Sequence, residues 1–248
     1  MTATRLANRA IVRLAPLEAN EDVAGFLQGL LTNDVMGELP TYAALLSAQG
    51  KTMFDMIVWP GPPAEHGATI LLDCEADVAD DLAKRLSLYR LRRKIEIAPD
   101  PGMAVHWSAK SDDAHPSDPR LAQLGSRWLA AADDGEPADE AWQVHRLHHG
   151  VAEGQAELGD VLWLETNAVE LNGVSFSKGC YIGQENTARM NWRQKVNRRL
   201  VVVPLGASDE ARRVAAYPEL GLAVDHLRVE SLDPAALPEW QRAGLAES

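Results

Sequence analysis

The order of apolar runs in the first hundred residues constrains the fold more than any other feature of the chain. A strand-like run at residues 10–14 and a short amphipathic segment at 22–31 come first. Three β-rich runs then follow without a helix between them, at residues 42–46, 53–59 and 68–72. The turn residues Gln49-Gly50-Lys51 predict a hairpin between the first two of these runs. Consecutive strands of this kind predict an α+β fold rather than a doubly wound parallel sheet.

Helix and loop signals continue through the rest of the chain. Apolar residues at nearly helical spacing predict a helix at residues 77–88, and a strand follows at 94–98. Polar stretches at 110–120 and 133–137 are typical of loops, and a helix is expected at 138–149, where Gly150 ends it. A strand at 200–205 opens the C-terminal part.

The size of the chain suits several small parts. A chain of 248 residues, 46% of them hydrophobic, can bury a sizeable core as one large domain or as two to three small ones. We expect a first α+β subdomain at residues 1–100, a second at 101–197, and a shortened C-terminal β segment at 198–248.

Charge limits the classes of partner. The formal net charge of −12 argues against general nucleic-acid binding, which depends on a basic surface. Half of the 24 basic residues nevertheless lie in two stretches, residues 84–94 and 178–199. Either stretch suits an anionic ligand or partner, but we interpret the first as a solvated helix face.

Three features of the sequence bear on membranes and on the cellular compartment. No apolar run approaches the roughly 18 residues that a membrane span requires. Residues 1–6 lack the apolar core of a secretory signal. The two cysteines are far apart in the sequence, which fits a reducing compartment. We therefore expect a cytoplasmic protein that does not bind membranes.

Residues 178–185, with the sequence Lys-Gly-Cys-Tyr-Ile-Gly-Gln-Glu, carry the densest chemistry in the chain. Cys180 lies two residues from Lys178, whose charge can favour the thiolate that attacks electrophiles or binds metals. The two glycines allow tight turns and the close approach of a ligand. The other cysteine, Cys74, ends an apolar strand and is interpreted as a structural thiol. A buried, inert thiol is the alternative interpretation of Cys180.

This octapeptide resembles the signature of the YgfZ-like proteins, folate-binding relatives of the glycine-cleavage T-protein (aminomethyltransferase) that serve in assembling or repairing iron–sulfur clusters. The mitochondrial iron–sulfur assembly factor of that family is especially similar. Further similar segments are Phe26-Leu27-Gln28-Gly29, Thr32-Asn33-Asp34-Val35, Asp118-Pro119-Arg120, Gly150-Val151-Ala152-Glu153-Gly154 and Leu164-Glu165-Thr166-Asn167. The resemblance implies a T-protein-like fold with three small parts around a central folate site, the last part being a β-barrel that is reduced here.

The resemblance also implies where a folate would bind. The pterin edge of tetrahydrofolate presents adjacent N–H donors to a carboxylate, and its glutamate tail requires a cation. Glu157 is similar to the acidic residue that holds the pterin in the T-protein, and Arg146 lies on the adjoining helix. Further candidates for contacts with folate are Asn33, Asp34, Glu165, Tyr181, Gln184 and Glu185. For Asn33 and Asp34, an ordinary cap or turn is an equally good interpretation.

The T-protein resembles this chain around residues 178–183 but lacks the cysteine, so the resemblance implies a protein that has left methylene transfer. Cys180, kept anionic by Lys178, would be the functional thiol. An iron–sulfur cluster normally takes four protein ligands, so Cys180 can bind a [2Fe–2S] cluster only by sharing it with a partner. The expected partners are an A-type iron–sulfur carrier and recipient iron–sulfur enzymes. The preferred hypothesis is a folate-binding iron–sulfur cluster assembly or maintenance factor rather than an enzyme.

Three alternatives stay open. A tetrahydrofolate-dependent aminomethyltransferase would depend on an acidic base instead of Cys180. A folate-binding or RNA-modification accessory module is motivated by the basic stretch at residues 84–94. His145, His148 and His149 lie at i, i+3 and i+4 of an expected helix, a spacing that can bind zinc, although a hydrated helix face explains them as well.

Overall fold

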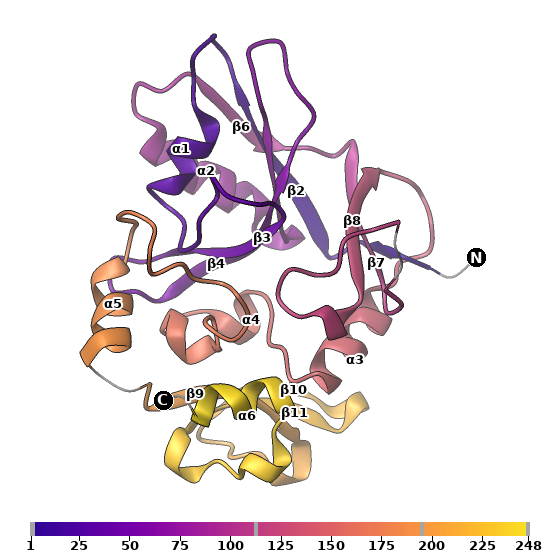
Figure 1. The fold of residues 1–248 in the computed structure, drawn as a ribbon. Coiled ribbons are helices and arrows are strands. Elements are labelled where there is room, and N and C mark those ends of the chain that lie inside the picture. The colour runs from indigo at the N-terminus through magenta and orange to yellow at the C-terminus, as the bar shows by residue number, and fades with distance from the viewer. Residues whose placement is uncertain (1–2, 112–113, 194–195, 247–248) are drawn as a thin grey trace.

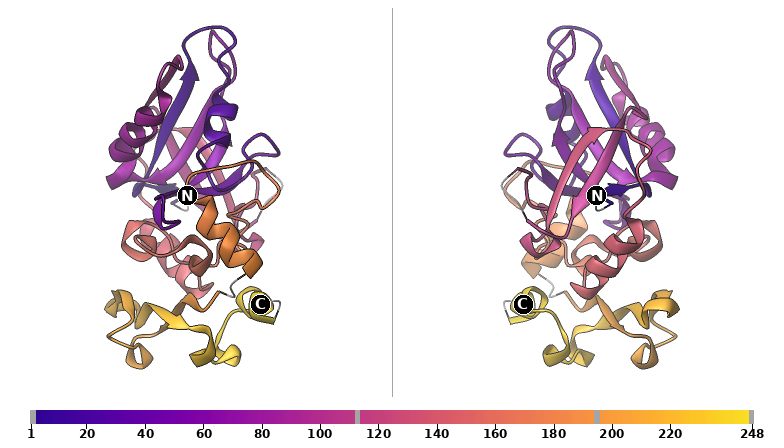
Figure 2. Two further views of the ribbon diagram at one scale, coloured as in Figure 1. Left: turned by 90° about the vertical axis from the view of Figure 1, so that its left-hand side faces the viewer. Right: turned by 90° about the vertical axis from the view of Figure 1, so that its right-hand side faces the viewer.

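A computed structural model describes residues 3–111, 114–193 and 196–246. Within them, three antiparallel β-sheets and six α-helices form the framework (Figure 1). The helices are α1 (Val23–Gln28), α2 (Ala79–Arg90), α3 (Asp139–His148), α4 (Gln155–Leu158), α5 (Gln184–Arg193) and α6 (Glu239–Ala246). The molecule is elongated, with the first sheet at one end, the third at the other, and α3, α4 and α5 between them (Figures 1 and 2).

The first sheet has five strands in the order β3-β4-β5-β2-β6. These strands are β2 (Arg9–Pro16), β3 (Thr41–Leu46), β4 (Thr52–Pro60), β5 (Ile70–Glu75) and β6 (Ile95–Pro99). Alternate side chains of a strand point to opposite faces, and here both faces are covered. Val12 and Leu14 pack with α1 and α2 in one core, whereas Ile11 faces a second core that contains Trp142 and Trp163. Because both faces of the sheet are buried, the sequences of its strands are nearly continuous runs of apolar residues.

The second and third sheets have three strands each. The second, in the order β1-β7-β8, joins β1 (Arg5–Leu6) to β7 (Met103–Ser108), with β8 (Ser126–Ala131) on the other side. The third, in the order β10-β11-β9, consists of β9 (Arg198–Pro204), β10 (Arg213–Tyr217) and β11 (Leu222–Arg228). Leu200 and Val224 of this sheet pack on Leu147 and Leu158, which connects the C-terminal part to α3 and α4. The third sheet is open, as expected for a reduced barrel.

The predicted α+β class is confirmed, and so are the hairpin between β3 and β4 and the helices that became α2 and α3. The sequence did not predict β1, β7, β8, β10, α4, α5 or α6, whereas the resemblance implied a closing strand at residues 221–223, where β11 begins. The division into three parts stays a prediction. One detail departs from it, because β1 at the start of the chain belongs to the second sheet.

Candidate functional site

The signature loop, residues 178–183, leads into α5 and displays one thiol. The side chain of Cys180 is exposed, whereas that of Cys74 is buried. The interpretation of Cys180 as a buried, inert thiol is therefore wrong. Burial raises the pKa of Cys74 to about 12, which keeps that thiol protonated and supports its structural interpretation.

One of the two signature glycines holds the loop against the β3–β4 hairpin. Gly183 has φ +80°, and a Cβ atom there would lie 2.5 Å from the carbonyl oxygen of Ser47 and 3.0 Å from Cα of Gly50. Gly50, in the hairpin turn, also has a positive φ of +79°. A side chain at Gly183 would thus be strained and crowded. Gly179 differs, because a Cβ atom there would meet no atom within 4 Å.

Lys178 anchors the loop to α1. Its side chain is 8% exposed overall, and its Nζ atom donates hydrogen bonds to the backbone carbonyls of Gln28 and Leu31. Nζ also lies 4.9 Å from the ring centroid of Tyr181, a cation–π distance. Burial lowers the pKa of Lys178 to about 8, and the nearby carboxylate of Asp34 opposes this shift.

This geometry bears on the predicted role of Lys178 as activator of the thiol. Its ammonium group is directed at the end of α1, where it satisfies carbonyls that the helix leaves without partners. Among the described residues, no hydrogen bond or ion pair joins Lys178 to Cys180. The contacts therefore favour an anchoring role, and activation of the thiol stays a prediction.

Asn33 and Asp34 stabilise the loop that follows α1. The Nδ2 atom of Asn33 donates to the carbonyls of Tyr42 and Asn172 at 2.9 and 2.7 Å, which joins this loop to the segment before the signature. Oδ1 of Asp34 accepts from Nε2 of Gln28 and from the backbone N–H of Met36, each at 3.0 Å. These contacts favour the local-turn interpretation over folate binding for both residues.

The other candidates for folate contacts have partners of their own, outside the surroundings of Glu157. Tyr181 is buried in the second core, and Glu185 forms an exposed ion pair with Arg189 at 2.7 Å. Oε2 of Glu165 lies 2.9 Å from Nε2 of His226 on β11. The backbone N–H of Gln184 donates to the carbonyl of Tyr181 at the start of α5. The structure therefore does not bring these four residues to one surface with Glu157.

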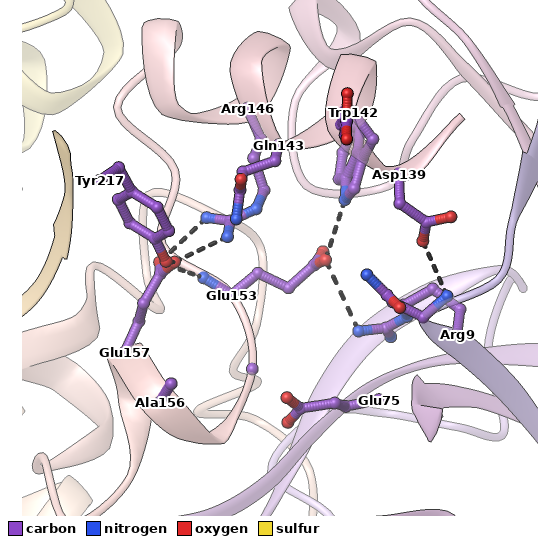
Figure 3. A pocket seen from close by; sticks show the side chains of 13 residues that line it. Arg9, Glu75, Asp139, Trp142, Gln143, Arg146, Glu153, Ala156, Glu157 and Tyr217 are labelled. Carbon is purple, nitrogen blue, oxygen red and sulfur yellow. Dashed lines mark hydrogen bonds and ion pairs between the residues drawn. The ribbon is translucent and has the colours of Figure 1, made fainter. Parts of the chain in front are cut away.

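A pocket of about 280 Å³ has walls from the first and third sheets and from α3 and α4, and we call it the junction pocket (Figure 3). Its lining comes from the start of β2 and the end of β5, from α3 and α4, and from Tyr217 at the end of β10. Of the predicted folate contacts, Arg146 and Glu157 line it. The signature loop contributes none of the described residues that line it, so the thiol and this pocket are separate sites.

Glu157 is already saturated with hydrogen bonds in this pocket. Nη2 and Nη1 of Arg146 donate to its two carboxylate oxygens at 2.6 and 2.9 Å, a bidentate ion pair (Figure 3). Tyr217 donates its hydroxyl to Oε1, and the backbone N–H of Glu153 donates to Oε2 at 3.0 Å. Glu157 is only 1% exposed. The arrangement leaves little acceptor capacity for a pterin edge and neutralises Arg146, so the pocket fits the predicted folate contacts poorly.

A buried, charge-balanced network lies beside this pocket. Its members are the arginines Arg9, Arg120 and Arg127 and the acids Asp73, Asp118 and Glu153. Glu153 accepts from Arg120 at 2.5 Å and from Nε1 of Trp142 at 2.9 Å. Although burial opposes it, the surrounding arginines hold the pKa of Glu153 well below its usual range. This network fixes the first sheet to the second and positions the walls of the pocket.

Sequence reasoning gave none of these six residues its place in the network. Asp118, Arg120 and Glu153 lie in segments noted for their resemblance and Arg127 lies close to one, but Arg9 and Asp73 lie in none of them. An available signal was Asp73, an acid directly after an apolar run. Such a residue inside a covered strand requires a buried cation as its partner.

The histidines of α3 have other partners than a metal. Nε2 of His145 lies 3.0 Å from the carbonyl oxygen of Gln123, and Nδ1 of His148 lies 2.7 Å from that of Val144. In the described part of the chain, no group of three or more His, Cys, Asp or Glu side chains is placed to hold a metal ion. Likewise, none of the described helices has the length and apolar character to cross a membrane.

Comparisons with known proteins show what the chain is similar to. No family model matches it. It is 36% identical over 242 residues to the mouse protein "Iron-sulfur cluster assembly factor IBA57, mitochondrial" and 34% identical over 238 residues to the human protein of that name. These alignments cover 82% and 80% of this chain. The chain spans 66% and 65% of the length of those relatives, slightly less than two thirds.

A solved structure supports the fold. The glycine cleavage system aminomethyltransferase T from Bartonella henselae matches with a TM-score of 0.63, over 91% of this chain and 78% of that one. Its sequence identity of 12% shows the fold alone. The predicted T-protein-like architecture is thus confirmed.

The predicted cytoplasmic location is wrong. The mouse and human relatives, and a 30% identical relative from Coccidioides immitis, are all named as mitochondrial, which points to mitochondria instead. The sequence argument failed because two separated cysteines indicate only a reducing compartment. The mitochondrial matrix meets that condition as well as the cytosol does.

Proposed function

Because the chain belongs to the family of the IBA57 iron–sulfur cluster assembly factors, we propose that it assembles or maintains iron–sulfur clusters through the thiol of Cys180. The observation that carries the proposal is the exposure of this thiol on a loop that is anchored on two sides. Gly183 fits the loop against the β3–β4 hairpin, and Lys178 fastens it to the end of α1. A ligand on a fixed loop loses little conformational freedom when it binds a metal.

The cluster is cargo in this proposal, and most of its ligands belong to a partner. A [2Fe–2S] cluster takes four protein ligands, and Cys180 supplies one. Its proton leaves to solvent, and the thiolate replaces one ligand of a cluster carried by an A-type carrier. No electrons are exchanged in this step. The remaining ligands stay with the carrier until a recipient iron–sulfur protein takes the cluster.

The surface around the thiol suits a protein partner. Met36 and Phe176 are large apolar side chains that are 60% and 37% exposed. They lie on the two segments that Asn33 joins through its hydrogen bond to Asn172. A Cβ atom at Gly179, next to Cys180, would meet no atom of the described residues within 4 Å, so the loop is uncrowded there. We assign the docking of the carrier to this surface.

The test is to mix the purified protein anaerobically with a [2Fe–2S]-loaded A-type carrier and record visible absorption and circular dichroism. We expect the cluster spectrum to change on complex formation with the wild type and with Cys74→Ala. Cys180→Ser should leave the carrier's spectrum unchanged. An identical spectral change with Cys180→Ser would remove the thiol from the mechanism.

Folate enters as a separate proposal, suggested by the T-protein-like fold. Because the four donors to Glu157 make the junction pocket a poor fit for a pterin edge, we propose that tetrahydrofolate binds there only when one of these donors leaves Glu157. No step of the cluster chemistry depends on this binding. Tyr217→Phe removes one such donor, so this variant should bind tetrahydrofolate more tightly than the wild type in calorimetry. Equal affinities of the wild type, Tyr217→Phe and Glu157→Ala would exclude Glu157 as the pterin ligand.

The comparisons support the aminomethyltransferase alternative only through the shared fold, since the sequence identity to aminomethyltransferase T is 12%. It predicts turnover of aminomethyl donors with tetrahydrofolate that does not depend on Cys180. Cluster assembly is the better-supported proposal, because relatives at 36% and 34% identity carry that name over most of the chain.

A further inference from the structure

A wide groove lies on the far side of α1 from the signature loop, and we call it the basic groove. It has a volume of about 1060 Å³, and its walls come from residues 18–21, from the α1 region including Phe26 and Leu30, and from residues 89–94 after α2. None of these residues takes part in the sites described above. The groove is large enough for several side chains of another protein.

An exposed leucine at the groove has a conformation that folding does not explain. Leu91 is 87% exposed, and its φ of +52° lies in the left-handed region that side-chain-bearing residues rarely adopt. Glycine would relieve this strain, and burial does not repay it. Leu88, three residues earlier, is also 64% exposed. Of these two leucines, Leu91 lines the groove and presents its apolar surface there.

Basic residues outnumber acidic ones in the lining of the groove, where Arg90, Arg92, Arg93 and Lys94 face Glu18 and Glu21. Among the described residues, Lys84, Arg85, Arg92 and Lys94 form no side-chain ion pair. Arg93 is the exception, paired with Glu21 at 2.9 Å and lying 5.9 Å over the ring of Phe26. A cation in the last turn of a helix suits its dipole, but Arg92 and Lys94 lie beyond the end of α2. This cluster is unusual in a chain whose net charge is −12.

We propose that the basic groove binds an acidic segment of a partner protein, with apolar side chains of that segment seated against Leu91 and Phe26. Charge complementarity supplies steering and the exposed Leu91 supplies contact area. A peptide suits this surface better than RNA or an anionic membrane does, because the net charge of −12 disfavours a long polyanion or an extended anionic surface, and the exposed Leu91 offers apolar contact to a side chain. This proposal does not depend on the chemistry of Cys180.

The groove also has a structural connection to the signature loop. Gly25, Phe26 and Leu30 line it, and the carbonyls of Gln28 and Leu31 in the same segment hold Lys178. A partner that contacts the thiol loop is therefore within reach of the groove across a single short helix. An acidic arm of such a partner would occupy it.

The test uses a fluorescein-labelled synthetic peptide of about 15 residues, long enough for marginal helix formation. It carries Leu and Phe at i, i+3 and i+4 among Asp and Glu, and its binding to the full chain is followed by fluorescence anisotropy at low salt. A scrambled peptide of the same composition, polyuridine RNA and phosphatidylglycerol vesicles are measured in parallel. We expect the patterned peptide to bind at least about tenfold more tightly than the scrambled one.

Two variants separate binding from folding. Leu91→Gly removes the apolar anchor but relieves the positive φ, so it should fold at least as stably as the wild type while losing about tenfold in affinity. Arg92→Glu with Lys94→Glu should weaken binding further and flatten its salt dependence, whereas the exposed Lys110→Glu serves as the matched control. The proposal is overturned if the peptide does not bind, if these variants bind like Lys110→Glu, or if RNA or vesicles bind at the groove more tightly than the peptide.

Discussion

The ion pair between Arg146 and Glu157 gives the most quantitative prediction about stability. Its two hydrogen bonds of 2.6 and 2.9 Å join groups that are 6% and 1% exposed, so each charge loses its main partner when the other is removed and gains little water in exchange. Removing one partner of such a buried pair destabilises a protein by about 3–5 kcal/mol. We therefore expect Arg146→Met and Glu157→Leu each to lower the free energy of unfolding by an amount in this range.

The double variant Arg146→Met/Glu157→Leu should behave differently. Replacing both charges with apolar side chains removes the uncompensated charge, and such replacements are often neutral or stabilising. We expect the double variant to be more stable than either single variant by at least about 2 kcal/mol. Tyr217→Phe should lose about 1.5–3 kcal/mol, the range for a hydrogen bond to a charged group.

Urea unfolding followed by circular dichroism measures these differences, since whole domains are stable by only about 5–15 kcal/mol. The wild type, the two single variants and the double variant form a double-mutant cycle, and Tyr217→Phe serves as a control outside it. Two outcomes would refute the assignment of a tightly coupled, buried pair. Either each single variant lowers the free energy of unfolding by less than about 1 kcal/mol, or the loss in the double variant equals the sum of the losses in the two single variants.

Three further predictions concern the signature loop and its thiol. Gly183→Ala should lower the free energy of unfolding in urea by about 1–3 kcal/mol, because Gly183 has a positive φ and a Cβ atom there would lie 2.5 Å from the carbonyl oxygen of Ser47. Gly179→Ala should be as stable as the wild type, and equal losses of stability in the two variants would contradict this account of the loop. The pKa of Lys178 falls from 10.5 unfolded to about 8 folded, so the unfolded state binds more protons between these values and stability should rise with pH across that window. Unfolding at about pH 7.5 and 9.5 should show this rise in the wild type and not in Lys178→Met, and parallel changes would rule out the buried ammonium. Ellman's reagent should modify one thiol of the folded chain quickly, Cys180, and reach Cys74 only after unfolding; fast loss of both thiols would contradict the burial of Cys74.

The elements that sequence patterns predicted well are those whose burial has a local signature. The strands around the Gln49-Gly50-Lys51 turn and the helix α2 have apolar residues at the spacing of their own structure. In contrast, β7 and β8 contain His, Trp, Ser and Arg, and their hydrogen bonds to each other decide their conformation. A two-residue strand such as β1 has no pattern of its own, and only its pairing with β7 defines it.

The site was predictable in its residues and not in their partners. Cys180, Lys178, Arg146 and Glu157 were all identified from motif and resemblance. From the sequence, Arg146 and Glu157 were assigned to folate and Lys178 to the thiol. In the structure, Arg146 and Glu157 bind each other, and Lys178 binds the carbonyls at the end of α1. Spacing along the chain cannot reveal such choices, because partners like Lys178 and Gln28 are 150 positions apart.

The central claim is that Cys180 is a ligand of a cluster shared with a carrier protein. Anaerobic native mass spectrometry of the mixed proteins tests it most directly, because it weighs the intact complex together with its cluster. The account predicts a complex that contains both proteins and one [2Fe–2S] cluster for the wild type and Cys74→Ala, and none for Cys180→Ser. A cluster-bearing complex of the same abundance with Cys180→Ser would contradict it.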